Sequence, residues 1–299
     1  MKFISYLMIA ALCLMTLSCS NEEQDVQTQT SENVLVPVTV HVDGFSVSQE
    51  EFPATRATTD VGEYNGVKAL TLAFYKSDGT EVFKHTQLRD DNTTFTTFGD
   101  FTCYLPRENY TMVVIANGGD NAVTLTNKTS ATYGENCVMD TFAASKAVNI
   151  TSTNVVNVTA TLNRIVSAVA VQSTDNRPVG VTYIRLTYSK GGKSFNPTTG
   201  LATSNTGFVN LMGLSGNPGS TTYLGGYLFL ATDEQEMNVT IETLDADGAV
   251  LFSKTVNNVP LKRNQVTKLT GAIYTLDARV NASSFLISDG WLTENNVTF

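Results

Sequence analysis

The stretch VLVPVTVHVDGFSV, residues 34–47, decides the fold. Side chains alternate between the two faces of a strand, and here five valines share one face: Val34, Val36, Val38, Val40 and Val42. The opposite face carries mixed residues: Leu35, Pro37, Thr39, His41 and Asp43. This alternation predicts a half-buried strand. Pro37 has no amide hydrogen to donate, which indicates a sheet edge or the start of a strand.

A segment further along the chain predicts a hairpin. VKALTLAFYKSDGTEVFKHTQ (67–87) has Asp78-Gly79 at its centre, a pair typical of a type I′ turn. MNVTIETLDADGAVLFSKTV (237–256) repeats the arrangement around Asp247-Gly248. In both segments a phenylalanine follows the glycine by four residues, at Phe83 and Phe252. Asp-Gly hairpins are common, but the repeat favours two domains of related β architecture.

Strand patterns dominate the rest of the chain. Residues 101–119 predict two strands, and 147–175, 181–190 and 264–280 predict further ones. Residues 121–147 are weakly patterned, and we expect a short helix or a loop there. Residues 191–226 are rich in Gly, Asn, Ser and Thr, which favours loops or short strands. The sequence therefore predicts an all-β protein.

Composition narrows the class of protein. The 299 residues are 42% hydrophobic and 16% charged, which is typical of a globular chain with room for about two domains. The net charge is −9, so a basic surface that could neutralise phosphates is not expected. We therefore expect no nucleic-acid partner.

The N-terminus predicts export. Lys2 precedes an apolar run from Phe3 to Leu17, which suits a signal peptide and is short for a membrane span. Ser18 and Cys19 end the run like a bacterial lipobox, in which the thiol of Cys19 is acylated; a plain signal peptide with an incidental cysteine is the alternative. Residues 20–33 are polar and nearly free of aliphatic side chains, as in a flexible tether.

Two cysteines remain after the predicted lipidation site, Cys103 and Cys137. In an exported protein they could form a disulfide, but two cysteines are too few to indicate a disulfide pattern. Pairing and two buried thiols both stay open.

Catalytic and metal-binding motifs are not evident. The two histidines, His41 and His85, lie in separate predicted strands without a partner motif. No nucleophile elbow or phosphate loop occurs, and DADG (245–248) lacks the remaining ligands of a calcium loop. We expect no enzyme activity, no cofactor and no metal; a carboxylate pair placed across a cleft, as in a glycosidase, stays open as the alternative.

Four segments occur in a familiar order: VKALTLAFYKSDG, RENYTMVVIANGGD, TLNRIVSAVAV and KRNQVTKLTGAIY. With the lipobox at Cys19 and the late Trp291, this order resembles the FimA-like fimbrillins of the Bacteroidales. The matching features are the strand end from Val114 to Gly118, Leu162 with Arg164, and Arg263 with Asn264. Residues 120–147 and 191–226 do not align with that pattern.

The resemblance implies two transthyretin-like β-sandwich domains with Greek-key-type connections. The expected parts are a signal peptide (1–18), a lipidated propeptide with the first strand (19–56), an N-terminal domain (57–159) and a C-terminal domain (160–299). It also implies that the precursor is cut after an arginine behind the first strand. An extended terminal segment of another subunit then fills the vacancy.

The chain carries candidates for each part of that mechanism. Arg56 is the only basic residue between Lys2 and Lys68, which favours a cut between Arg56 and Ala57. Loss of five buried valines at ~1.5 kcal/mol each would cost roughly 7 kcal/mol, comparable with the net stability of a domain. The tail at about 283–299 carries apolar side chains that could share one face of a donor strand: Phe285, Ile287, Trp291, Val297 and Phe299.

The predicted function is a structural subunit of a cell-surface fimbrium that serves adhesion. Its expected partners are other fimbrial subunits in a homo- or heteropolymer, the outer membrane through the lipid (a palmitate-type acyl chain) of the precursor, and a host or bacterial receptor. One alternative is a tip or anchoring subunit, which would keep its lipid and first strand. Another is a surface glycan-binding lipoprotein, for which the single Trp291 supplies a poor aromatic platform.

Overall fold

The computed structural model describes residues 34–46, 58–59, 61, 64, 66–89, 98–119, 123–134, 137–275 and 286–289. In these ranges the regular secondary structure consists of β-strands only, so the prediction of an all-β protein is confirmed. The described residues belong to one compact unit, Asn33–Phe299. The division into two domains at residues 159 and 160 stays a prediction.

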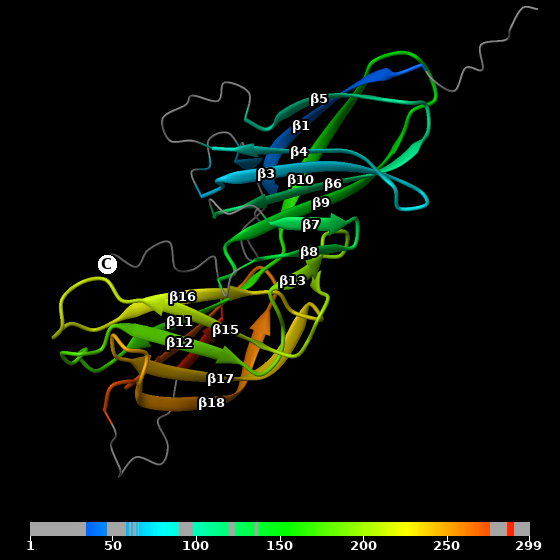
Figure 1. Cartoon of the computed structure of the whole chain (residues 1–299). Coiled ribbons are helices and arrows are strands. Elements are labelled where there is room, and N and C mark those ends of the chain that lie inside the picture. The colour runs from blue at the N-terminus through cyan, green and yellow to red at the C-terminus, as the bar shows by residue number, and fades with distance from the viewer. Residues whose placement is uncertain are drawn as a thin grey trace, which may run out of the picture. The chain divides into compact units, whose positions relative to one another are not determined.

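The first strands form one sheet in the order β2-β1-β10-β9-β6-β3-β4, with β5 beside β1 (Figure 1). Their bounds are β1 Val36–Ser46, β2 Thr58–Thr59, β3 Ala69–Lys76, β4 Glu81–Leu88, β5 Asp100–Leu105, β6 Asn109–Asn117, β9 Thr141–Asn149 and β10 Val156–Arg164. β10 and β9 pair over only two residues each, at Asn163–Arg164 and Phe142–Ala143. Side chains of β1, β5 and β10 share one core with those of β3 and β6, so the two parts of the sheet face each other. The sheet folds over at this short β9–β10 junction.

Two further four-stranded sheets enclose a second core. One has the order β16-β11-β19-β20 and the other β15-β12-β17-β18. Their bounds are β11 Ser167–Ser173, β12 Tyr183–Tyr188, β15 Phe208–Gly213, β16 Tyr223–Leu228, β17 Glu234–Leu244, β18 Val250–Lys262, β19 Val266–Gly271 and β20 Leu286–Asp289. Alternate residues of β12 and β17 point into this core, among them Ile184, Leu186, Val239 and Ile241.

A fourth sheet contains short strands from distant parts of the chain, in the order β14-β13-β8-β7. Its strands are β7 Thr124–Asn127, β8 Ser130–Thr132, β13 Ser194–Asn196 and β14 Leu201–Ala202. A third core lies beside it, where the rings of Phe195 and Phe229 stack with centroids 4.2 Å apart.

The expected short helix or loop at 121–147 is wrong for the described residues there, which form β7, β8 and the first part of β9. Val123 and Leu125 are buried while Thr124 is exposed, so the strand alternation is present over only a few residues. A pattern this short cannot be told from a loop in sequence. The short strands expected within 191–226 are confirmed as β13, β14, β15 and the start of β16.

Both predicted Asp-Gly hairpins are present, but their turns are not type I′. Asn258 and Asn264 are the only described residues other than glycine with a positive φ. Asp78 therefore lacks the positive φ that a type I′ turn requires. Gly79 has φ 91°, its N–H donates to Lys76 O (3.0 Å), and Lys76 N–H donates to Thr80 O (2.9 Å). This is a type I turn followed by a glycine bulge. The same bonds join Asp245 with Gly248 and Ala249 in the second hairpin.

Candidate functional site

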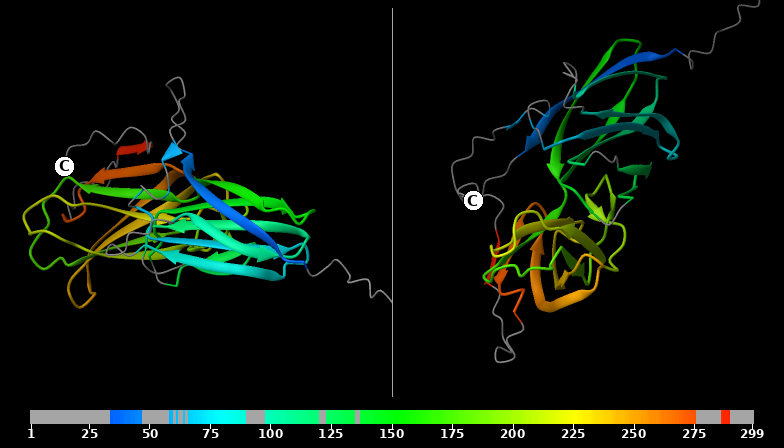
Figure 2. Two further views of the ribbon diagram at one scale, coloured as in Figure 1. Left: turned by 90° about the horizontal axis from the view of Figure 1, so that it is seen from above. Right: turned by 60° about the vertical axis from the view of Figure 1, so that its left-hand side comes forward.

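Strand β1 lies inside its sheet and not at an edge. It runs parallel to β10 from Val38↔Val156 to Phe45↔Leu162, and antiparallel to β5 from Val36↔Leu105 to His41↔Asp100. Figure 2 shows β1 (blue) beside β10 (green). Of the two positions that the sequence left open for Pro37, the strand start is correct, because Pro37 is the second residue of β1.

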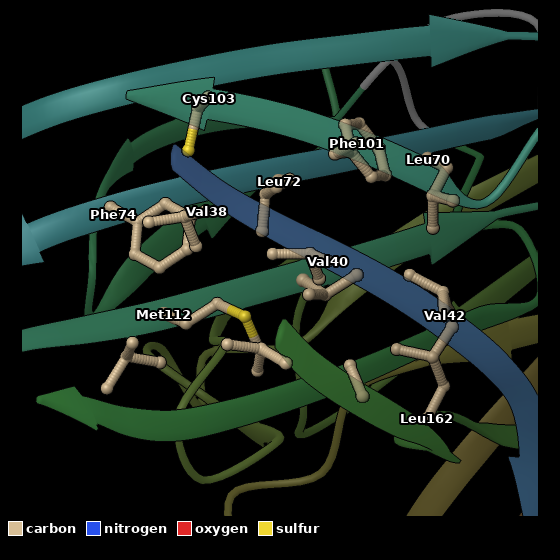
Figure 3. Close-up of a cluster of buried hydrophobic side chains, with 14 of the residues drawn as sticks. Val38, Val40, Val42, Leu70, Leu72, Phe74, Phe101, Cys103, Met112 and Leu162 are labelled. Carbon is tan, nitrogen blue, oxygen red and sulfur yellow. The ribbon is translucent and has the colours of Figure 1, made fainter. Parts of the chain in front are cut away.

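The valine face of β1 points into the first core. Val36, Val38, Val40 and Val42 are completely buried, whereas Val34 precedes the strand and is 48% exposed. The buried valines belong to the same core as Leu70, Leu72, Phe74 and Met112 of the facing strands (Figure 3). At ~1.5 kcal/mol per buried valine, these four contribute about 6 kcal/mol, an upper estimate because an unfolded chain is partly compact. The predicted face therefore contains four buried valines, not five.

On the outer face, His41 joins β1 to β5. Its Nδ1 lies 2.6 Å from Asp100 Oδ1 and its Nε2 lies 3.2 Å from Asp43 Oδ1. A carboxylate oxygen can only accept, so these contacts suit an imidazolium ring that donates from both nitrogens. The His41 side chain is 48% exposed, and such pairs contribute at most about 1 kcal/mol. The retention of β1 therefore depends mainly on its buried face and its backbone pairing.

Cys103 lies opposite Val38 in the register of β5 and β1. Its side chain is buried, and this burial raises the pKa of the thiol to about 11. Cys137 is exposed, and its Sγ lies 3.7 Å from Met139 Sδ. No disulfide joins Cys103 to Cys137, so the pairing that the sequence left open is not formed, and only Cys103 is buried. The position of Cys103 beside β1 was not predictable, because the pairing of strands cannot be inferred from local patterns in the sequence.

Most residues of the predicted processing and donor sites lie outside the described part of the chain: Cys19, Arg56, Ala57, Phe285, Trp291, Val297 and Phe299. Ile287 lies in β20, which pairs antiparallel with β19 and places Ile287 opposite Leu269. The structure therefore places the described part of the tail, β20, beside β19 and not in the sheet that contains β1.

Asp175 fixes the segment that leads into the tail. Its carboxylate accepts hydrogen bonds from the backbone N–H groups of Ile273 (2.9 Å), Tyr274 (2.8 Å) and Thr275 (2.9 Å), and from Thr275 Oγ1 (2.9 Å). Burial alone would raise the pKa of Asp175, but these donors outweigh it and the pKa is lowered. Asp175 is not among the residues predicted from the sequence, since a single aspartate in a loop carries no motif.

The described residues contain no group of three or more His, Cys, Asp or Glu side chains that could hold a metal ion. His85, in β4, contacts the ring of Phe101 edge-on, with centroids 6.2 Å apart. The part of the chain that the structure describes also holds no helix with the length and hydrophobicity of a membrane span.

Comparisons with known proteins place the chain in a family but do not assign an activity. The model of a family of unknown function, DUF6562, matches residues 27–295. No curated protein matches the chain in sequence.

Several solved structures are similar at low identity. The fimbrial anchor protein Mfa2 from Porphyromonas gingivalis is 12% identical, with 86% of this chain and 97% of that chain covered and a TM-score of 0.48. An adhesin candidate from Bacteroides thetaiotaomicron VPI-5482 is 10% identical (85% and 95% covered, TM-score 0.47), and one from Bacteroides ovatus is 12% identical (86% and 92% covered, TM-score 0.47). With TM-scores below 0.5, these likenesses decide neither the fold nor the function of this chain.

Proposed function

For this chain, which belongs to the DUF6562 family of unknown function, we propose a role as a structural subunit of a cell-surface fimbrium that serves adhesion. The precursor is exported as a lipoprotein, attached to the outer membrane through Cys19, and cut between Arg56 and Ala57. The subunits then polymerise by strand exchange. The protein is not an enzyme in this proposal, and its partners are other fimbrial subunits and a surface receptor.

The position of β1 is the observation that carries the proposal. β1 is the N-terminal strand, yet it pairs on both sides, with β5 and with β10. Its removal would leave two unpaired strand edges and uncover the core that Val36, Val38, Val40 and Val42 now cover. Unpaired edges beside an apolar groove are a template for the addition of another strand. A subunit without β1 would therefore be stabilised by a strand from a neighbour.

The proposed cut suits this geometry. Arg56 lies in the sequence between β1, which ends at Ser46, and β3, which begins at Ala69. A single cut there separates both Cys19 and β1 from the rest of the chain. The release from the membrane and the opening of the groove become one event, which prevents polymerisation before export.

The proposed donor is the tail at about 283–299. Its apolar residues at odd positions can present one face, as the valines of β1 do: Phe285, Ile287, Trp291, Val297 and Phe299. A tail strand placed between β5 and β10 would restore backbone pairing on both sides and cover the core again.

An anchoring or tip subunit is the second candidate. The complete burial of the β1 valines supports it, because a precursor that keeps β1 is already a closed, stable form. An anchor would retain the acylated Cys19 and residues 19–56, whereas a stalk subunit would lose both.

Replacement of the proposed cleavage residue tests the function. Arg56→Ala should leave the precursor lipidated, uncut and unable to form fibres, because β1 stays in place. Lys68→Ala, at the next basic residue along the chain, is the matched control and should mature normally. Normal fibres from Arg56→Ala would show that the proposed site is wrong.

A further inference from the structure

A cavity in the described part of the chain contains no residue of β1 or of the proposed tail. It has a volume of about 430 Å³ and is lined by β9, β10, the turn at 198–200 and the turn at 263–264. It brings together Arg164 and Arg263–Asn264, which belong to separate segments of the sequence; Arg164 and Asn264 are 100 residues apart.

The lining favours an anion through its guanidinium N–H donors, and each arginine is also paired with a carboxylate outside the lining, Arg164 with Asp140 and Arg263 with Asp233. Arg164 and Arg263 both line the cavity, and none of its described lining residues is acidic. The remaining polar groups are hydroxyls and amides, including those of Ser145, Asn163 and Thr198. Two guanidinium groups beside neutral donors and acceptors form a suitable site for a carboxylate that is attached to a polar molecule.

The Arg164 guanidinium is held in a fixed orientation. Its Nε and Nη2 donate to the two carboxylate oxygens of Asp140 at 2.8 Å and 3.0 Å, and the ring of Phe142 lies 4.6 Å away. Asp140 does not line the cavity, and Nη1 is directed toward Asn264 Oδ1 at 3.5 Å. The aspartate therefore positions the arginine from behind, and a ligand does not need to order it.

A backbone carbonyl and a carboxylate hold the second arginine. Arg263 Nη1 donates to Thr199 O at 2.7 Å, and Nη2 pairs with the exposed Asp233 at 2.7 Å. Gly200 has φ 73°, and a Cβ there would lie 2.9 Å from Arg263 Nη1. Asn264 has φ 61°, the left-handed conformation that asparagine adopts more readily than most residues other than glycine, and it places the side chain in this turn.

We infer that this cavity binds a small ligand with a carboxylate beside several hydroxyl groups, the chemistry of an acidic sugar residue. The arginines would bind the carboxylate, and the hydroxyl and amide side chains would bind the sugar hydroxyls. The volume lies within the range of roughly 300–1,000 Å³ that is usual for small-molecule sites. Because the cavity contains neither β1 nor the tail, this inference holds or fails independently of strand exchange.

Titration calorimetry of the full-length protein with glucuronic acid tests the inference, with glucose and inorganic phosphate as comparison ligands. Asn264→Gly suits the positive φ and removes only the side chain, so the turn should fold. Asn258→Gly is its matched control, since Asn258 also has a positive φ (55°) and does not line the cavity. Arg263→Gln removes the second charge, and thermal unfolding verifies that each variant is folded.

We expect glucuronic acid to bind and glucose to bind at least about tenfold more weakly, since a charge-assisted pair to the carboxylate is lost. Arg263→Gln and Asn264→Gly should each weaken the binding of glucuronic acid by between about twofold and tenfold, and Asn258→Gly should not change it. Absence of binding, equal binding of glucose, equally tight binding of phosphate, or binding that Arg263→Gln leaves unchanged would each overturn the assignment.

Discussion

Val38 in β1 lies directly opposite Cys103 in β5, and both side chains are buried. The thiol is inert in this position for two reasons. Reagents cannot reach it, and a pKa of about 11 leaves roughly one thiol in a thousand ionised at pH 8. The strand that the proposed cut removes is therefore the strand that shields Cys103.

The reactivity of Cys103 should report the presence of β1. In a chain that begins at Ser20 and carries Cys137→Ser, Cys103 is the only thiol. We expect a maleimide to leave the uncut protein unmodified and to label Cys103 after a cut confined to Arg56. A synthetic peptide of residues 283–299 should then protect Cys103 again. Equal labelling before and after the cut would mean that β1 remains bound or never shields the thiol.

Truncation of a single buried valine should destabilise the first core. Val40→Ala removes two buried methyl groups and should lower the free energy of unfolding of the uncut chain by about 2 kcal/mol. Val34→Ala is the same change at a site that is 48% exposed, and this variant should lower the free energy of unfolding by less than about 0.5 kcal/mol. Denaturant unfolding measures both values, and equal losses would contradict the burial of the β1 valines.

The carboxylate of Asp175 should make stability depend on pH at the acidic end. Its pKa is lowered in the folded protein, so the unfolded chain takes up a proton first as the pH falls. The stabilisation is therefore complete above the unfolded pKa of about 3.9 and disappears as the pH falls through the lower folded value.

Asp175→Asn tests this dependence. Above about pH 5 the variant should unfold with a free energy roughly 1–2 kcal/mol lower than that of the wild type, because hydrogen bonds to a charged acceptor are lost. The difference should shrink below about pH 4. A difference that stays constant down to pH 2 would contradict the role given to the ionised carboxylate.

The turn of the first hairpin should require glycine. Gly79 has φ 91° and open space around it, so Gly79→Ala adds backbone strain without a steric clash and should cost about 1–2 kcal/mol. Gly134→Ala also meets open space but lacks the positive φ, and it should be nearly neutral. Thermal unfolding of both variants measures this. A neutral Gly79→Ala would argue against the turn described for β3 and β4.

Local patterns along the chain were sufficient to predict most strands and both hairpins, but not β7 and β8. The alternation of valines predicted β1, and Asp78-Gly79 predicted where β3 turns into β4, although not the turn type. The pairing partners of the strands were not predictable, because they lie far apart in the sequence. Thr39 of β1, for example, lies opposite Thr102 of β5 on one side and Asn157 of β10 on the other. For the same reason the shielding of Cys103 and the bonds of Asp175 to residues 273–275 became visible only in the folded chain.

The N-terminus of the subunit within assembled surface fibres tests the central claim most directly. Mass spectrometry of intact subunits from purified fibres should give a chain that begins at Ala57 and lacks both the acylated Cys19 and β1. Fibres built from subunits that still carry residues 34–46 would contradict the replacement of β1 by a neighbouring strand.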